Sequence, residues 1–195
     1  MRTIFIATEN KHKVREIGEI LARCGVKLEQ KKIKISEPHE GSLEMVACEK
    51  ARQAYEQLKE PVIAEDTGIY FGAYKDFPGV MAKRVYLQLG FKGLVALVKA
   101  AEDKNAEFRT AICFKWGAGK EEQKCFSGSC KGRLLDKVVL PEKDRLPYEK
   151  IFVPEGYEKA MVEIPVGEKN RISHRAKAAV ALGKWLQANP KSQAL

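Results

Sequence analysis

The stretch Pro61-Val62-Ile63-Ala64-Glu65-Asp66-Thr67-Gly68 decides the fold prediction for this chain. Three apolar residues after a proline predict a buried strand, and two adjacent carboxylates follow where that strand should emerge. Thr67-Gly68 predicts a turn; without one, alternation along the strand would point Glu65 and Asp66 to opposite faces. With the turn, one cation could contact both, which predicts an oxygen-ligand magnesium site at the C-terminal edge of a sheet. The alternative is a solvated strand end with a capping acid.

Length and composition predict one soluble domain. The chain has 195 residues, 45% of them hydrophobic, which is enough for a full core with or without a small second lobe. A formal net charge of +9 without a long basic block indicates either an anionic partner or a solvated basic surface. We find no signal-peptide pattern and no apolar run near the roughly 18 residues of a membrane span. The expected location is therefore the cytoplasm, with no membrane partner.

The cysteines predict reduced thiols. They are odd in number, form no CxxC pair and stand mostly in apolar runs, which is typical of a cytosolic protein and gives no zinc signature. The five are Cys24, Cys48, Cys113, Cys125 and Cys130.

The order of hydrophobic patterns predicts β-α-β units followed by a hairpin, which indicates an α/β fold with a mixed sheet. Strands are expected at residues 3–7, 27–35, 62–64, 108–116, 123–129 and 134–140. Helices are expected at residues 14–21, 43–58, 94–101 and 176–186, and a loop at 141–154.

The polar loop after the first strand is a candidate anion site. A loop that opens a helix offers free N–H groups and the positive end of the helix dipole, and Lys13 would add a charge. The loop has no glycine, so it is not a Walker A loop. The alternative, that Thr8 or Asn10 is simply an N-cap beside surface lysines, stays open.

The second helix is expected to begin after Ser42 as N-cap and to carry Lys50 outside its apolar face. Glu40, in the loop before it, is either an exposed acid or a third oxygen ligand beside Glu65 and Asp66.

A cluster of donors precedes the last helix. Ser173 fits its N-cap, and Lys169, His174 and Arg175 crowd the same helix start, which is unfavourable against the dipole. This crowding predicts a bound anion or an acceptor-rich ligand.

Taken in order, five motifs resemble the inosine triphosphate pyrophosphatase family over residues 3 to about 187. They are Thr8-x-Asn10-x-x-Lys13, Glu65-Asp66-Thr67-Gly68, Pro78-Gly79 before Arg84, Phe152-x-Pro154-Glu155-Gly156-Tyr157, and Glu168-Lys169-Asn170 before Ser173-His174-Arg175. The resemblance implies Mg²⁺-dependent hydrolysis of deaminated purine nucleoside triphosphates (ITP, dITP, XTP) to the monophosphate and pyrophosphate. It also implies a central mixed twisted sheet flanked by helices, two lobes with a cleft between them within one domain of residues 1–195, and a homodimer.

The resemblance assigns roles as well. Glu65 and Asp66 would be catalytic, with Asp66 as the base, and both would bind Mg²⁺, or Mn²⁺ as an alternative, together with Glu40. Glu37 is an alternative to Glu40, because this loop is a residue short of the family's. The residues expected to bind the nucleotide are Thr8, Asn10, Lys13, Lys50, Thr67, Arg84, Tyr148, Glu149, Lys169, Ser173, His174 and Arg175.

One segment departs from the family pattern. The family's Phe-Gly-(Tyr/Trp)-Asp-Pro is here Leu146-Pro147-Tyr148-Glu149-Lys150. Leu146 removes an aromatic face on which a base could stack, Pro147 forbids positive φ, and Glu149 is a methylene longer than aspartate. We therefore expect hydrolysis to survive with altered selectivity against GTP.

Two other functions remain open on the residues alone. A basic nucleic-acid-binding module would use the lysines on phosphates, but no array of interleaved aromatics is found, so no stable nucleic-acid complex is expected. The second alternative is a relative that binds nucleotides without hydrolysing them. The altered segment at residues 146–150 motivates this alternative.

Overall fold

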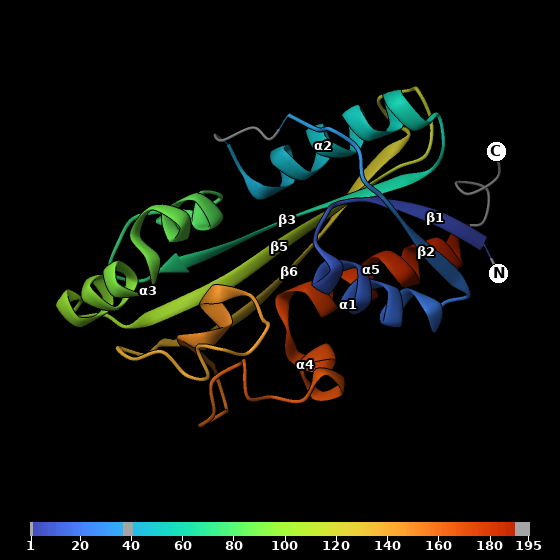
Figure 1. The fold of residues 1–195 in the computed structure, drawn as a ribbon. Coiled ribbons are helices and arrows are strands. Elements are labelled where there is room, and N and C mark those ends of the chain that lie inside the picture. Colours follow the sequence, from blue (N-terminus) through green and yellow to red (C-terminus); the bar gives the residue numbers. More distant parts are fainter. Residues whose placement is uncertain (1, 37–40, 190–195) are drawn as a thin grey trace.

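The computed structural model describes residues 2–36 and 41–189, which form helices around one mixed sheet (Figure 1). The strand order is β2-β1-β3-β5-β6-β7, with β4 paired to β3. Strands β1 and β2 and strands β1 and β3 are parallel, and the remaining pairs are antiparallel, so the predicted mixed sheet is confirmed. The strands are β1 (Arg2–Ala7), β2 (Val26–Lys31), β3 (Val62–Phe71), β4 (Pro78–Gly79), β5 (Asn105–Lys115), β6 (Gln123–Leu134) and β7 (Phe152–Pro154).

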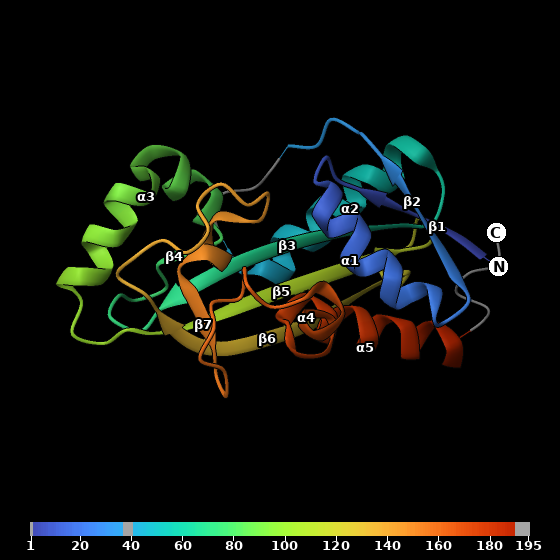
Figure 2. The ribbon, with the colours of Figure 1, turned by 60° about the horizontal axis from the view of Figure 1, so that its bottom comes forward.

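The helices cover both faces of this sheet. They are α1 (Lys11–Ala22), α2 (Leu43–Leu58), α3 (Ala82–Ala100), the 3-10 turn η1 (Pro147–Lys150), α4 (Val166–Ile172) and α5 (His174–Ala188). Helix α2 lies on one face and α1 and α5 lie on the other, while α3 lies at the far end of the long strands (Figures 1 and 2). Alternation along β3 explains both faces: Ile63 packs among residues of α1 and α5, whereas Ala64 packs against α2.

The arrangement has two lobes. The core under α1 and α5 is separate from a second core that joins α3, η1 and the far ends of β3, β5 and β6. On the α2 face of the sheet, a hollow of about 880 Å³ lies between the start of α2 and β4. No helix in the described part of the chain is long and apolar enough to cross a bilayer.

The predicted turn at Thr67-Gly68 is wrong. Strand β3 continues through both residues to Phe71, because Thr67 and Gly68 pair with Thr110 and Arg109 of β5 in the antiparallel ladder. The glycine serves the close approach of β4 instead: a Cβ at Gly68 would lie 2.6 Å from the carbonyl oxygen of Gly79.

Other boundaries also differ from the sequence prediction. The expected strand at residues 134–140 is wrong, because β6 already ends at Leu134. Helix α3 begins twelve residues before the predicted position 94 and is kinked at Gly90, which has φ 59°. The expected loop at residues 141–154 contains η1 and β7, and α4 was missed.

Candidate active site

The two acids of the motif lie at an opening in the edge of β3. Strand β1 pairs with β3 only as far as Ile63, and β4 begins to pair at Ile69. Within the described residues, the segment between them, which holds Glu65 and Asp66, has no strand partner on this edge. Helix α1 begins four residues after β1 ends, so its first turn lies beside the same opening.

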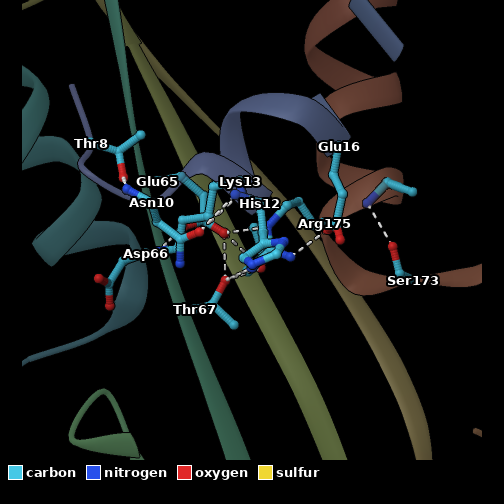
Figure 3. A network of polar contacts seen from close by, with 12 residues as sticks. Thr8, Asn10, His12, Lys13, Glu16, Glu65, Asp66, Thr67, Ser173 and Arg175 are labelled. Atoms are coloured by element: carbon cyan, nitrogen blue, oxygen red, sulfur yellow. Dashed lines mark hydrogen bonds and ion pairs between the residues drawn. The ribbon is translucent and has the colours of Figure 1, made fainter. Parts of the chain in front are cut away.

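Because β3 does not turn, the two carboxylates leave the strand on opposite sides. Figure 3 shows Glu65 among Lys13 and Arg175, with the Asp66 carboxylate pointing away from them. Asp66 instead lies on the α2 side, where Oδ1 accepts a hydrogen bond from Lys50 Nζ at 3.1 Å. The turn that would have brought both acids to one cation is therefore absent.

Glu65 is fully buried and paired on both oxygens. Oε1 accepts a hydrogen bond from Arg175 Nε at 2.9 Å and another from the Thr67 hydroxyl, while Oε2 forms an ion pair with Lys13 Nζ. Burial alone would raise the pKa of Glu65, but the charges of Lys13 and Arg175 hold it well below its usual range. Glu65 is thus ionised in the folded protein.

A chain of ion pairs continues from Arg175. Its Nη1 donates to Glu16 Oε2 at 2.6 Å, and Lys169 Nζ lies 2.5 Å from Glu16 Oε1 and 2.8 Å from Glu149 Oε1. Burial would raise the pKa of Glu16, but Arg175 and Lys169 lower it. The crowding of cations at the start of α5 is therefore relieved by the protein's own carboxylates, and the prediction that it needs a bound anion loses its basis.

Glu16 was missed by sequence reasoning. Its side chain is only 2% exposed, although the residues next to it in the sequence do not indicate a buried acid. The helical spacing could have revealed it. One face of the helix carries Lys13, Glu16, Ile17 and Ile20, so the acid lies on the side that packs inward.

Lys50 is likewise buried, so the prediction that it lies outside the packed face of α2 is wrong. Its Nζ also donates to the carbonyl oxygen of Glu65 at 3.3 Å, which places this cation at the opening in β3. Burial raises the pKa of Asp66, and the Lys50 charge opposes part of that rise. A carboxylate with a raised pKa is a stronger base than an ordinary one.

At the start of α1, local capping uses the residues predicted to bind phosphate. Asn10 is the N-cap, and its Oδ1 accepts from the backbone N–H of His12 at 2.9 Å and of Lys13 at 3.3 Å. The Thr8 hydroxyl accepts from the N–H of Asn10 at 3.2 Å. The N-cap alternative is confirmed for Asn10, and phosphate binding by these two residues stays a prediction.

His174 has hydrogen-bonding capacity that its surroundings do not use. Its ring stacks on Phe108 with centroids 4.6 Å apart, it is 1% exposed, and neither ring nitrogen has a hydrogen-bond partner among the described residues. Burial and the nearby Arg175 charge lower its pKa well below 6.5, so the ring is neutral. Ser173 is the N-cap of α5, as predicted, and accepts from the N–H of Ala176.

We expect His174 to make the protein less stable as the pH falls below 6.5. The unfolded chain takes up a proton there and the folded chain does not, so stability is present above pH 6.5 and declines below it by up to about 1.4 kcal/mol per pH unit. Urea unfolding between pH 5 and 7 measures this slope. His174→Phe should flatten it, and an unchanged slope in His174→Phe would contradict the assignment.

The remaining predicted site residues lie elsewhere or outside the described chain. Tyr148 is buried in the core under α3, where its hydroxyl donates to the carbonyl oxygen of Ala82 at 2.9 Å. Arg84 is exposed near the start of α3 and makes no hydrogen bond or ion pair with another described residue. Glu37 and Glu40 lie outside the described residues.

The described donors partly fit Mg²⁺. This ion usually takes one or two protein carboxylates together with substrate phosphates. Asp66 offers such a carboxylate, whereas both oxygens of Glu65 already contact cations. Among the described residues, no three carboxylate or histidine groups lie close enough to one another to enclose an ion.

Comparison with known proteins covers nearly the whole chain. Residues 4–185 match the model of the Ham1 family. A "dITP/XTP pyrophosphatase" of Hyperthermus butylicus is 39% identical over 95% of both chains, and an "Inosine triphosphate pyrophosphatase" of Tuber melanosporum is 35% identical over 97% of this chain and 99% of the relative. A solved HAM1 protein structure from Coxiella burnetii has a TM-score of 0.81 at 25% identity, covering 96% of this chain and all of the other.

The family model and these full-length relatives agree with the ordered motifs and with the mixed sheet, and on that ground the chain belongs to the Ham1 family.

Proposed function

We propose that this protein hydrolyses deaminated purine nucleoside triphosphates, namely dITP, ITP and XTP, to the monophosphate and pyrophosphate. Relatives that share more than a third of its residues over nearly full length are named for this reaction. The observation that carries the proposal is the interleaving of acids and cations at one edge of β3, where Asp66 meets Lys50 and Glu65 meets Lys13. A polyphosphate would need such cations, and an attacking water would need a carboxylate to take its proton.

The residues divide the work as follows. Lys13 and Lys50 would neutralise oxygens of the triphosphate, and Asp66 would orient the attacking water and take its proton. A bound Mg²⁺, held by Asp66 and phosphate oxygens, would supply charge neutralisation at the bond that breaks. Glu40 and Glu65 stay predictions as further ligands, and Glu65 would first have to release Lys13 or Arg175.

Base selection would depend on His174. Lys169 and Arg175 already donate to carboxylates, whereas the two buried His174 nitrogens have no hydrogen-bond partner among the residues that the structure describes. A neutral imidazole donates from one nitrogen, and the 6-keto oxygen of hypoxanthine or xanthine would accept that bond. Adenine's 6-amino group would leave the donor unsatisfied, at a cost of about 1–3 kcal/mol or roughly tenfold to hundredfold in selectivity.

The altered segment at residues 146–150 would change the protein contacts near the 2-position of the base. Glu149 is 1% exposed, and its Oε2 has no hydrogen-bond partner among the described residues, although Oε1 binds Lys169. An acceptor of this kind near the base would interact differently with guanine, which carries a 2-amino donor, and with xanthine, which carries a 2-keto acceptor. We therefore keep the prediction that discrimination against GTP differs from the family's.

We expect pyrophosphate release from ITP, dITP and XTP to exceed release from ATP by roughly tenfold to hundredfold in kcat/KM. The measurement is a nucleotide panel with magnesium, repeated with EDTA, which should abolish turnover because the phosphate charges lose their counter-ion. Release of single phosphates, equal rates on ATP, or full activity in EDTA would contradict the proposal. A nucleic-acid binder or a silent relative would release no pyrophosphate.

Two further expectations accompany this function. The homodimer implied by the family resemblance predicts a solution mass near twice 21.9 kDa by light scattering. A role in cleansing the nucleotide pool places the protein in the cytoplasm.

A further inference from the structure

Three cysteines that are far apart in the sequence meet on the α2 face of the sheet. They are Cys48 of α2, Cys113 of β5 and Cys125 of β6, and their sulfur atoms all lie within 4.8 Å of one another. The register explains the contact: Cys113 and Cys125 are directly opposite each other in the β5–β6 ladder, on the face against which α2 packs.

The three thiols have mainly apolar neighbours, so they interact chiefly with one another. The cluster lies among apolar side chains shared by α2, β3 and β5, namely Leu43, Ala47, Ala51, Ala64 and Ala111. None of the three is in a disulfide; Cys113 is buried, whereas Cys48 and Cys125 are partly exposed and leave a route for a small ion.

The spacing suits a metal ion bound by three sulfurs. With a metal–sulfur distance of about 2.3 Å, tetrahedral ligands are separated by about 3.8 Å. Sulfurs that already lie within 4.8 Å would have to approach one another by at most about 1 Å, which side-chain adjustment on α2 can supply.

We propose that Cys48, Cys113 and Cys125 form a binding site for a soft, thiophilic cation such as Zn²⁺ or Cu⁺. Soft thiolates select these ions over Mg²⁺, which prefers oxygen, so the site is chemically distinct from the candidate active site. Zn²⁺ would keep a fourth position for water, and Cu⁺ would be satisfied by three sulfurs. Each thiol that binds the ion releases its proton to the buffer.

An ion in this site would join α2 to the β5–β6 hairpin. The same helix carries Lys50, two residues after Cys48, and Lys50 contacts Asp66 at 3.1 Å. Occupancy would therefore stabilise the fold and hold the helix that presents Lys50 to the opening in β3. Both effects can be measured without any nucleotide, so the test does not depend on the proposed pyrophosphatase reaction.

The experiment uses the reduced, chelator-treated full-length protein under anaerobic conditions. Cd²⁺, a spectroscopic probe for thiolate ligands, is titrated and its thiolate-to-metal charge-transfer absorption is followed; Zn²⁺ and Cu⁺ are then measured by competition with indicator chelators. We expect one equivalent of metal, a raised melting temperature, and alkylation of three of the five cysteines slowed by roughly tenfold or more. The competition arms show which of the two ions is held more tightly.

Matched variants separate a site from incidental thiol binding. Cys125→Ser removes a partly exposed ligand and should weaken binding by roughly a hundredfold or more, since even an outer-shell change costs ten- to hundredfold. Cys48→Ser repeats the test from another element in case one variant folds poorly, and Cys24→Ser, a thiol outside the cluster, should bind as the unmodified protein does. Absence of stoichiometric binding, or equal losses of affinity in Cys24→Ser and Cys125→Ser, would overturn the proposal.

Discussion

Replacing Asp66 by asparagine should lower pyrophosphate release from ITP by roughly a hundredfold to ten-thousandfold while the protein stays folded. The side-chain amide has almost the same shape as the carboxylate, and its oxygen can still accept from Lys50 Nζ, which now lies 3.1 Å from Oδ1. The amide cannot take a proton from water, however, and it carries no charge to attract a metal ion.

The measurement is kcat with saturating ITP and magnesium, together with urea unfolding to show that the fold is intact. Asp136→Asn is the matched control, because Asp136 is an exposed aspartate whose carboxylate forms an ion pair with a lysine, Lys104, at 3.4 Å. The control should leave kcat unchanged. Near-normal rates in Asp66→Asn would mean that another group activates the water.

Replacing Arg175 by methionine should lower the free energy of unfolding by about 3–5 kcal/mol at pH 7. The guanidinium is 1% exposed and contacts two buried carboxylates, Glu16 and Glu65. Methionine fills much of the volume but leaves both acids with fewer partners, and an uncompensated buried charge is far more costly than a lost surface ion pair.

The Arg52→Met variant tests whether burial of the ion pairs causes the loss of stability expected in Arg175→Met. Arg52 also contacts two carboxylates, Glu49 and Glu56, but on the exposed surface of α2. Exposed pairs contribute about 0–1 kcal/mol, so this variant should be nearly as stable as the unmodified protein. Equal losses in the two variants would contradict the buried-network interpretation.

The pH dependence of the Arg175→Met deficit follows from the same charges. In the unmodified protein the folded-state pKa values of Glu16 and Glu65 are lowered, so their contribution is present above pH 4.5 and is lost as the pH falls through those lowered values. Without Arg175 these acids protonate more easily, and the difference between variant and unmodified protein should shrink as the pH falls from 7 towards 4. Urea unfolding across that range measures it, and a constant difference would argue against an electrostatic cause.

Local patterns predicted most elements correctly because their causes are local. Apolar spacing marked the helices and strands of the parallel half of the sheet, and Ser42 and Ser173 were identified as N-caps from their place before helical runs. The ordered motifs identify the family from the sequence alone, since their spacing is the one that the chemistry requires. The misplaced features lie where pairing with a distant segment overrides the local signal.

The turn at Thr67-Gly68 is the clearest case of that override. A Thr-Gly pair favours a turn locally, but ten consecutive residues of β3 pair with β5, and the ladder keeps the backbone extended. Glycine is required here for the approach of β4, which no local pattern reveals. The extended path then places Glu65 and Asp66 on opposite faces.

By itself, the sequence determined the α/β class and the family, and it predicted which acids and cations take part in the chemistry, because residue type and local spacing carry that information. Only the tertiary structure decided how those charges are paired. Glu65 and Arg175 form a hydrogen bond although they are 110 residues apart in the chain, and Lys50 donates a hydrogen bond to Asp66 of another element. Three cysteines from three elements meet on one face of the sheet. Such contacts depend on long-range strand register and helix packing, which bring together side chains whose local sequences contain no mutual signal.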